Sequence, residues 1–422
     1  MKNVDTPVHR LPEELLGEIL TLSVIASWKE TRGPVALSVC PRWRMVALST
    51  PRVWSNISFL SPNHTQAEFK RAETWLARSG QSPLTIHVGH HVERAMELLV
   101  PFSARWISVV FLADPSRAPN LPMIKGELPL LESLKLINPG YDPTSTFKVF
   151  NTAPRLRHLT YFEYCNIHEV LVPWDKLASC TVTTFRSLAD AISLLSNAPN
   201  LTDLTIHIQS HGVARHSPHP AIRHPRLASL HLHAPFHGAQ FLNILELPSL
   251  RDLRIYPSFD TTWQPASVAA LLSRSKCNLN RLLIHMGAAS AHQLSQLLHM
   301  SPSLEHLTLE FDRGYRWFSA LKILEPEHGL VPALRTLCLD FKGDFDFAEL
   351  ALMVEARWWG VYGYCSGSDI SLKSVRARCY CDGPFLKVDP LSIERLKALH
   401  WEGLDIGFVV GQELRQEGEP FL

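Results

Sequence analysis

The sequence lacks several features that would each point to a particular class of protein. It contains no uncharged apolar run of roughly 18 residues, so we expect no membrane-spanning helix. Its 41 Lys and Arg nearly balance its 40 Asp and Glu, so no basic excess indicates binding to nucleic acid or to an anionic membrane. The opening segment MKNVDTPVHRLPEE has no apolar stretch of the kind found in secretory signals. These absences favour a cytoplasmic or nuclear protein.

Cysteine is scarce as well, with 8 residues in 422. Cys40, Cys180 and Cys338 lie in apolar sequence surroundings, which favours reduced thiols over a disulfide framework. The sequence also has no phosphate-binding loop, no HExxH, no GxSxG and no dinucleotide-binding fingerprint. We therefore predict a protein that is not an enzyme and that has no catalytic residues, cofactor or metal.

Two groups of potential metal ligands leave an alternative open. One consists of His207, His211, His216, His219, His224, His231, His233 and His237. Neutral imidazoles bind zinc well, but three prolines mark this segment as a long polar loop, and the spacing fits no common zinc template. The other group is Cys365 with Cys379 and Cys381, three thiols without a clear fourth ligand. Loop histidines and free thiols are the favoured interpretation, and a metal-dependent hydrolase is the least favoured class of function.

Residues 11–22, LPEELLGEILTL, predict an amphipathic helix. Pro12 suits the first helical position, where its missing N–H costs nothing, and the helix dipole favours the two glutamates that follow. The apolar stripe at helical spacing consists of Leu15, Leu16, Ile19 and Leu20. A second short helix is predicted over residues 34–40 and a third over RWRMVALS, followed by an extended piece, SNISF. So short a motif cannot bury its apolar faces by itself, and they therefore need a partner.

This segment resembles the F-box. The matching residues, in family order and at near-family spacing, are Leu11, Pro12, Glu14, Leu15, Leu16, Ile19, Leu20, Val39, Cys40, Trp43, Ala47 and Trp54. The segment SVIASWKETRG, which precedes the second helix, is somewhat longer than its usual counterpart. The resemblance implies that residues 1–60 bind a Skp-family adaptor, and through it a cullin scaffold. The adaptor-binding residues it implies are Leu11, Pro12, Leu15, Leu16, Ile19, Leu20, Val39, Cys40 and Trp43. The alternative is an ordinary helical cap on the end of a repeat array.

A linking helix is predicted over residues 61–80, with Phe69, Ala72 and Leu76 facing inward and Gly80 ending it. Beyond it, residues 81–422 are dominated by an apolar pattern of the form L-x-x-L-x-L. Its copies begin at Trp106, Leu131, Leu156, Leu177, Leu201, Leu227, Leu250, Leu279, Leu304, Leu334, Leu372 and Leu396. Most intervals fall within the roughly 20–29-residue period of leucine-rich repeats. A proline commonly stands two residues before the first position, where it can start a turn into a strand.

Helical stretches such as SLADAISLLSNA and SAHQLSQLLHM lie between the copies. An alternation of strand and helix at this period is similar to that of leucine-rich-repeat proteins. We therefore predict an α/β fold in which a short N-terminal α-helical F-box precedes an irregular leucine-rich-repeat solenoid. Its parallel strands are expected on the concave face and its helices outside. The array is irregular because the Asn or Cys usual at the ninth position is replaced, for example by Pro139 and Tyr164.

A leucine-rich array behind an F-box is a familiar arrangement. The resemblance implies the substrate-recognition subunit of an SCF-type E3 ubiquitin ligase complex, whose repeats hold an unidentified protein target. The alternative is a leucine-rich-repeat scaffold that binds a protein without coupling it to ubiquitination. Binding to the adaptor would separate the two.

Strand alternation places the polar positions of each copy on the concave face. The residues predicted to bind the target are Arg254, Tyr256, Arg281, His285, His231, His233 and His306. Arg and Tyr are favoured anchors at interfaces, although the strand residues on a solvent-facing surface are often simply polar. If the target is acidic, binding is expected to strengthen between about pH 7.5 and about pH 6, because histidine titrates there.

Overall fold

The computed structural model describes most of the chain. The described residues are 10–26, 36–61, 65–113, 120–121, 124, 128–137, 147–165, 171–185, 188–208, 221–233, 238–256, 265–286, 290–311, 317–341, 347–359, 372–379 and 389–410. Within these ranges the fold is α/β, with a large parallel sheet of 14 strands and a small sheet of two, β8 (Ile222–Arg223) and β10 (Leu245–Glu246). Two compact units divide the chain: residues 1–186 with 196–201, and residues 187–195 with 202–422.

The first unit opens with helices at the three predicted places: α1 (Glu13–Ala26), α2 (Ala36–Val39), α3 (Pro41–Ser49) and the short 3-10 helix η2 (Pro51–Trp54). These elements share a helical core made of Leu16, Leu20, Val46, Ala47, Val53 and Trp54. The Trp54 indole N–H donates to the Ala47 carbonyl at 2.7 Å. A Cβ added to Gly17 would lie 3.0 Å from the Thr50 hydroxyl, so a residue without a side chain allows α1 to approach the end of α3.

Six strands follow in the first unit, in the order β1-β2-β3-β4-β5-β6. The elements are β1 (Asn56–Phe59), α4 (Gln66–Arg78), β2 (Leu84–Val88), α5 (Val92–Leu99), η3 (Val100–Arg105), β3 (Trp106–Phe111), β4 (Ser133–Leu136), η6 (Phe147–Thr152), β5 (His158–Cys165), η7 (Trp174–Lys176) and β6 (Ser179–Phe185). The predicted linking helix is α4, and its predicted inward residues are buried. It connects two paired strands, β1 and β2, so the sheet already begins inside the range predicted for the F-box.

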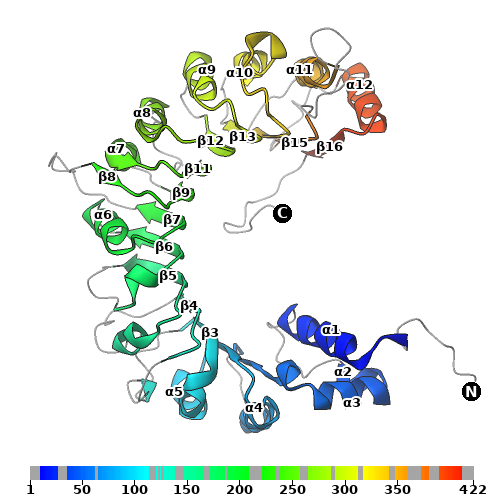
Figure 1. The fold of residues 1–422 in the computed structure, drawn as a ribbon. Coiled ribbons are helices and arrows are strands. Elements are labelled where there is room, and N and C mark those ends of the chain that lie inside the picture. Colours follow the sequence, from blue (N-terminus) through cyan, green and yellow to red (C-terminus); the bar gives the residue numbers. More distant parts are fainter. Residues whose placement is uncertain are drawn as a thin grey trace, which may run out of the picture. The chain divides into compact units, whose positions relative to one another are not determined.

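The second unit holds eight strands of the sheet, in the order β7-β9-β11-β12-β13-β14-β15-β16. The elements are α6 (Leu188–Asn197, mostly in this unit), β7 (Asp203–Ile208), β9 (Ser229–His233), α7 (Gly238–Ile244), β11 (Asp252–Tyr256), α8 (Pro265–Ser275), β12 (Arg281–His285), α9 (Ala291–His299), β13 (His306–Phe311), α10 (Trp317–Ile323), η8 (Pro326–His328), β14 (Thr336–Phe341), α11 (Phe347–Trp359), β15 (Ser374–Cys379), α12 (Pro390–Trp401) and β16 (Asp405–Val410). Helices α8 to α11 lie on the same side of these strands (Figure 1).

The apolar pattern accounts for these strands. The middle leucines of the pattern are at most 2% exposed, as Leu204, Leu253 and Leu307 show. They belong to the core of the protein. Before many strands a tight turn contains the predicted proline. In one, the Leu250 amide donates to the Leu247 carbonyl at 3.1 Å, with Pro248 at the second turn position. Proline favours that position because its ring presets the backbone angle, so the recurrent proline positions each strand start.

The last predicted copy was wrong. Leu396, Leu399 and Trp401 lie in helix α12, and the strand comes later, as β16. The helix begins at Pro390 and is capped by the Asp389 side chain, which accepts from two backbone amides. Leu396 and Leu399 are buried at a three-residue spacing, which is also a helical spacing, whereas Trp401 is 87% exposed. A leucine pair three residues apart therefore does not separate strand from helix.

None of the helices in the described ranges is long and apolar enough to cross a lipid bilayer.

Replacing Leu204 with Asp is expected to lower the free energy of unfolding by several kcal/mol, because it would bury a carboxylate without a partner. Thr205→Asp, on the other face of the same strand, is expected to cost much less, because this side chain is only half-buried. Urea unfolding of the two variants measures the difference. Equal destabilisation by the two variants would contradict the assignment of Leu204 to the buried face of β7 and of Thr205 to the opposite face.

Candidate functional site

Apolar side chains remain exposed on the three N-terminal helices although these helices have their own core. We call this set the helical patch; its members are Leu15, Ile19, Leu22, Val39, Met45 and Leu48. Their exposed fractions run from 44% for Ile19 to 62% for Leu22. Exposed apolar patches on a small folded element are typical of surfaces that bind another protein.

The implied adaptor-binding residues divide into three groups in the structure: exposed, buried and half-buried. Leu15, Ile19 and Val39 belong to the helical patch, and Pro12 is exposed beside them in sequence. Leu16 and Leu20 instead are at most 1% exposed in the helical core, so they hold α1 against α3 rather than facing outward. The sequence resemblance did not single out Leu22, Met45 and Leu48, although Leu22 follows Leu15 and Ile19 at helical spacing.

Three residues of partial burial complete the implied set. Leu11, Cys40 and Trp43 are half-buried, and each has a local structural contact. The Leu11 carbonyl accepts from the Arg42 guanidinium, the Cys40 sulfur accepts from the Trp43 amide at 3.5 Å, and the Trp43 side chain packs on the helical core. Cys40 thereby caps the start of α3.

A second candidate surface lies on the strands of the second unit, on the face that does not carry the buried leucines. We call it the polar face. Because the strands pair in register, its side chains form rows across the sheet. An edge row contains Asp203, Ser229, Asp252, Arg281, His306, Thr336, Ser374 and Asp405; a middle row contains Thr205, His231, Arg254, Leu283, Thr308, Cys338 and Arg376; and an end row contains His207, His233, Tyr256, His285, Glu310, Asp340 and Arg378.

All seven residues predicted to bind the target lie in these rows. Of the seven, Arg281 is exposed and the other six are half-buried. Two further positions of the same face, Leu283 and Glu310, are buried, with exposed fractions of 9% and 7%. The face therefore offers polar atoms and charges rather than a broad apolar surface.

Three rings of the end row stack on one another. The His207 and His233 rings lie 3.8 Å apart at an angle of 22°, and the His233 and Tyr256 rings lie 4.3 Å apart at 12°. Rings stacked in this way hold each other in place, so the row presents ring edges, with their nitrogens and a phenol hydroxyl, at fixed positions.

Arg254 is held in place by a carboxylate. Its guanidinium donates two hydrogen bonds to Asp252, at 3.1 Å and 3.0 Å, and the His231 ring lies 4.0 Å from the same carboxylate. Burial alone would raise the pKa of Asp252, but hydrogen bonds from His231 and Arg254 outweigh it and lower the pKa to about 2. Asp252 was not among the residues predicted to bind the target, and its contact makes Arg254 a less accessible anchor than predicted.

His306 lies beside Arg281 in the edge row. Burial lowers the pKa of His306, and the positive charge of Arg281 lowers it further, while Glu305 and Asp252 act in the opposite direction and Arg335 again lowers it. The lowered pKa makes His306 gain its positive charge less readily than an ordinary histidine as the pH falls. We therefore expect it to contribute less than the other histidines to the strengthening of binding that was predicted between about pH 7.5 and about pH 6.

The two groups of possible metal ligands lie partly outside the described residues. His211, His216, His219, His237, Cys365 and Cys381 all fall there. Where the structure describes the chain, no three His, Cys, Asp or Glu side chains come together as metal ligands. Cys379 is buried at the end of β15.

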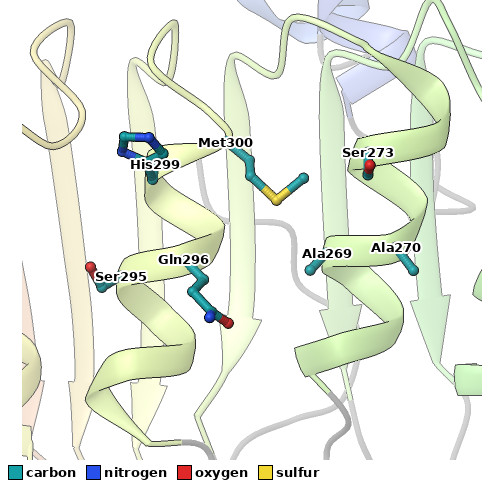
Figure 2. Close-up of a pocket in the computed structure, with 7 residues that line it drawn as sticks. All are labelled: Ala269, Ala270, Ser273, Ser295, Gln296, His299 and Met300. Carbon is teal, nitrogen blue, oxygen red and sulfur yellow. The ribbon is translucent and has the colours of Figure 1, made fainter.

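A shallow groove lies between α8 and α9, away from the polar face. Figure 2 shows its lining, with Met300 reaching from the end of α9 toward the small side chains Ala269 and Ala270 of α8. The remaining lining residues are Ser273, Ser295, Gln296 and His299. The described lining of this groove contains no Asp, Glu, Lys or Arg.

Comparison with known proteins identified no matching family model and no matching curated protein.

Asp252→Asn tests how tightly Arg254 is held. It is expected to lower the free energy of unfolding by on the order of 2 kcal/mol at pH 7, because a half-buried guanidinium loses its charged partner. Since the pKa of Asp252 is lowered in the folded chain, its contribution is full above about pH 4 and lost as the pH falls toward 2.

The measurement is urea unfolding of the parent and Asp252→Asn at pH 7 and at pH 3. The gap between the two proteins should be smaller at pH 3. Asp203→Asn, an exposed carboxylate in the same row, is the matched control and should change little. A gap that does not depend on pH would contradict an ionic role for Asp252.

Proposed function

We propose that this chain is the substrate-recognition subunit of an SCF-type E3 ubiquitin ligase complex, acting in the cytoplasm or nucleus and performing no bond chemistry itself. The observation that carries the proposal is the helical patch. Three short helices with a complete small core still expose large aliphatic side chains, of which Leu15, Ile19 and Val39 belong to the residues that resemble an F-box.

The spacing of the exposed side chains on two helices supports the proposal. Leu15, Ile19 and Leu22 follow one another at four- and three-residue spacing, so they form one stripe along α1. Met45 and Leu48, three residues apart, form a second stripe on α3. Burying a few such aliphatic anchors commonly supplies most of the binding free energy of an interface. We assign this surface to a Skp-family adaptor, which would link the chain to a cullin scaffold.

The strands are assigned to target binding. In each unit the sheet grows by parallel pairing of successive strands, with helices in many of the connections, and this supports the proposed leucine-rich-repeat solenoid. The polar face then carries the target. A receptor of this kind accelerates ubiquitin transfer by raising the local concentration of target lysines near the charged enzyme.

The alternative is a leucine-rich-repeat scaffold in which the three helices are only a cap. One observation favours it: Trp54 also contacts α4, with its ring 6.0 Å from that of Trp75 and the Arg78 guanidinium 4.6 Å above it. A cap needs such contacts with the rest of the array. A cap does not need the aliphatic side chains that α1 and α3 expose.

The double change Leu15→Asp with Ile19→Asp is expected to abolish capture of a purified Skp-family adaptor by the full chain. Both side chains are about half exposed, so the charges would face solvent in the free protein but would have to be buried in the complex. Pull-down with the adaptor and a thermal melt of each protein are the two measurements.

The matched control is Leu352→Asp with Leu391→Asp, which places the same charges at exposed leucines of α11 and α12. This control should capture the adaptor as the parent does. Undiminished capture by the Leu15 and Ile19 variant would exclude the helical patch as the adaptor site. Absence of capture by the parent itself would favour the scaffold.

A further inference from the structure

Four cationic residues stand at or just before the starts of strands β11, β12, β14 and β15, along one edge of the sheet. Arg281 belongs to the edge row, and Arg251, Arg335 and Lys373 each stand one residue before a strand. Backbone hydrogen bonds fix their order across the sheet. The Arg281 amide donates to the Arg251 carbonyl at 2.8 Å, the Arg335 amide to Glu305 at 2.8 Å, and the Lys373 amide to Arg335 at 2.7 Å. We call this set the cationic edge.

Within the described residues, the side chains of the cationic edge have no hydrogen bond or ion pair. Arg251, Arg281 and Lys373 are exposed, and Arg335 is half-buried. Two carboxylates lie along the same edge. Asp252 is already bound to the Arg254 guanidinium, and among the described residues Glu305 forms no ion pair although it stands next to Arg335 in the same row. Burial is the largest cause of the lowered pKa of His306, which lies between Arg281 and Arg335. The charges of these two arginines also lower it, and those of Glu305 and Asp252 raise it.

We infer that the cationic edge binds an acidic segment of a partner protein, laid across the starts of strands β11 to β15. The inference rests on the proposed function only in naming that partner as the ubiquitination target. Charge complementarity is the physical reason: a row of unpaired cations in a chain of nearly zero net charge favours a ligand with a matching row of anions.

The spacing of the cations selects an extended acidic peptide over a single phosphate group. Neighbouring strands are about 4.8 Å apart, so the four spacings from β11 to β15 cover about 19 Å. An extended peptide covers that distance with about six residues. A single phosphate is instead held by guanidinium groups that converge on one point, whereas these cations are spread along a line. Glu305 and Asp252 within the same edge also make it a poor surface for the continuous charge of a nucleic acid.

The test measures direct binding of a labelled peptide to the purified full chain by fluorescence anisotropy. The probe is a twelve-residue peptide in which Glu alternates with Ser, about twice the length of the edge. Peptides with Gln or Lys in place of Glu, and one with a single phosphoserine among Gln residues, serve as comparisons. We expect the Glu peptide to bind, and its affinity to fall when the salt concentration is raised from about 50 to about 200 mM, because surface charges are then screened.

The double variant Arg281→Gln with Arg335→Gln is expected to bind the Glu peptide at least tenfold more weakly than the parent. Arg155→Gln with Lys397→Gln removes the same net charge at exposed positions of other elements and is expected to bind like the parent. Equal loss in both variants would indicate an effect of net charge alone and would overturn the inference. So would unchanged binding by the Arg281 and Arg335 variant, equal affinity for the Gln peptide, or a preference for the phosphoserine peptide.

Adaptor capture is measured on the same preparations. The Arg281 and Arg335 variant should capture the adaptor as the parent does, because the helical patch is unchanged. Failure of the parent to capture the adaptor would count against the proposed ligase function while leaving peptide binding as a property of the sheet. Failure of peptide binding in a parent that captures the adaptor would count against the cationic edge alone.

Discussion

In-register parallel pairing of the strands is the constraint on which the second unit depends. From β9 to β16 each polar-face residue lies beside its counterpart on the next strand, without a register shift among the paired residues of the described strands. Alternation then sends most leucines and isoleucines within the strands to the core and the residues between them to the opposite face. A shift of one residue in any pairing would expose a row of leucines and bury a row of charges, so register and burial enforce each other. The ring stack and the cationic edge both exist only because of this alignment.

The N-terminal helices use leucines both in a core and on an exposed surface. On α1, Leu16 is buried in the helical core, and the adjacent Leu15 is 53% exposed. A core of six residues is small, and the contacts of Trp54 with Trp75 and Arg78 join it to α4. This leaves the outer stripes of α1 and α3 available to a partner while the inner ones stabilise the motif. The proposed binding surface and the core are therefore separated by one helical position.

Charge pairing likewise distinguishes two arginines of the polar face. Arg254 and Arg281 are the same residue type on neighbouring strands, and both are plausible anchors from the sequence. Both carboxylate oxygens of Asp252 accept hydrogen bonds from the Arg254 guanidinium. No ion pair among the described residues involves Arg281. The available charge of the face thus lies at the strand starts. At the other end of the strands, the rings of His207 and His233 stack on each other and on Tyr256.

The sequence by itself determined the alternation of strands and helices, the three N-terminal helices and the facing of the strand leucines, because all of these follow from local periodicity and from prolines at turns. It failed at Leu396, Leu399 and Trp401, where a three-residue spacing is compatible with strand and helix alike, and a capped helix formed. Only the tertiary structure decided which leucines of α1 are buried, which arginine is paired, and which cations line one edge. The burial of the α1 leucines and the order of the cations depend on neighbours 20 to 40 residues away along the chain, as in the backbone contacts of Arg335 with Glu305 and of Lys373 with Arg335, and local patterns carry no information about such pairs. The partner of Arg254, Asp252, lies only two residues away, but the spacing alone does not say that the two side chains meet.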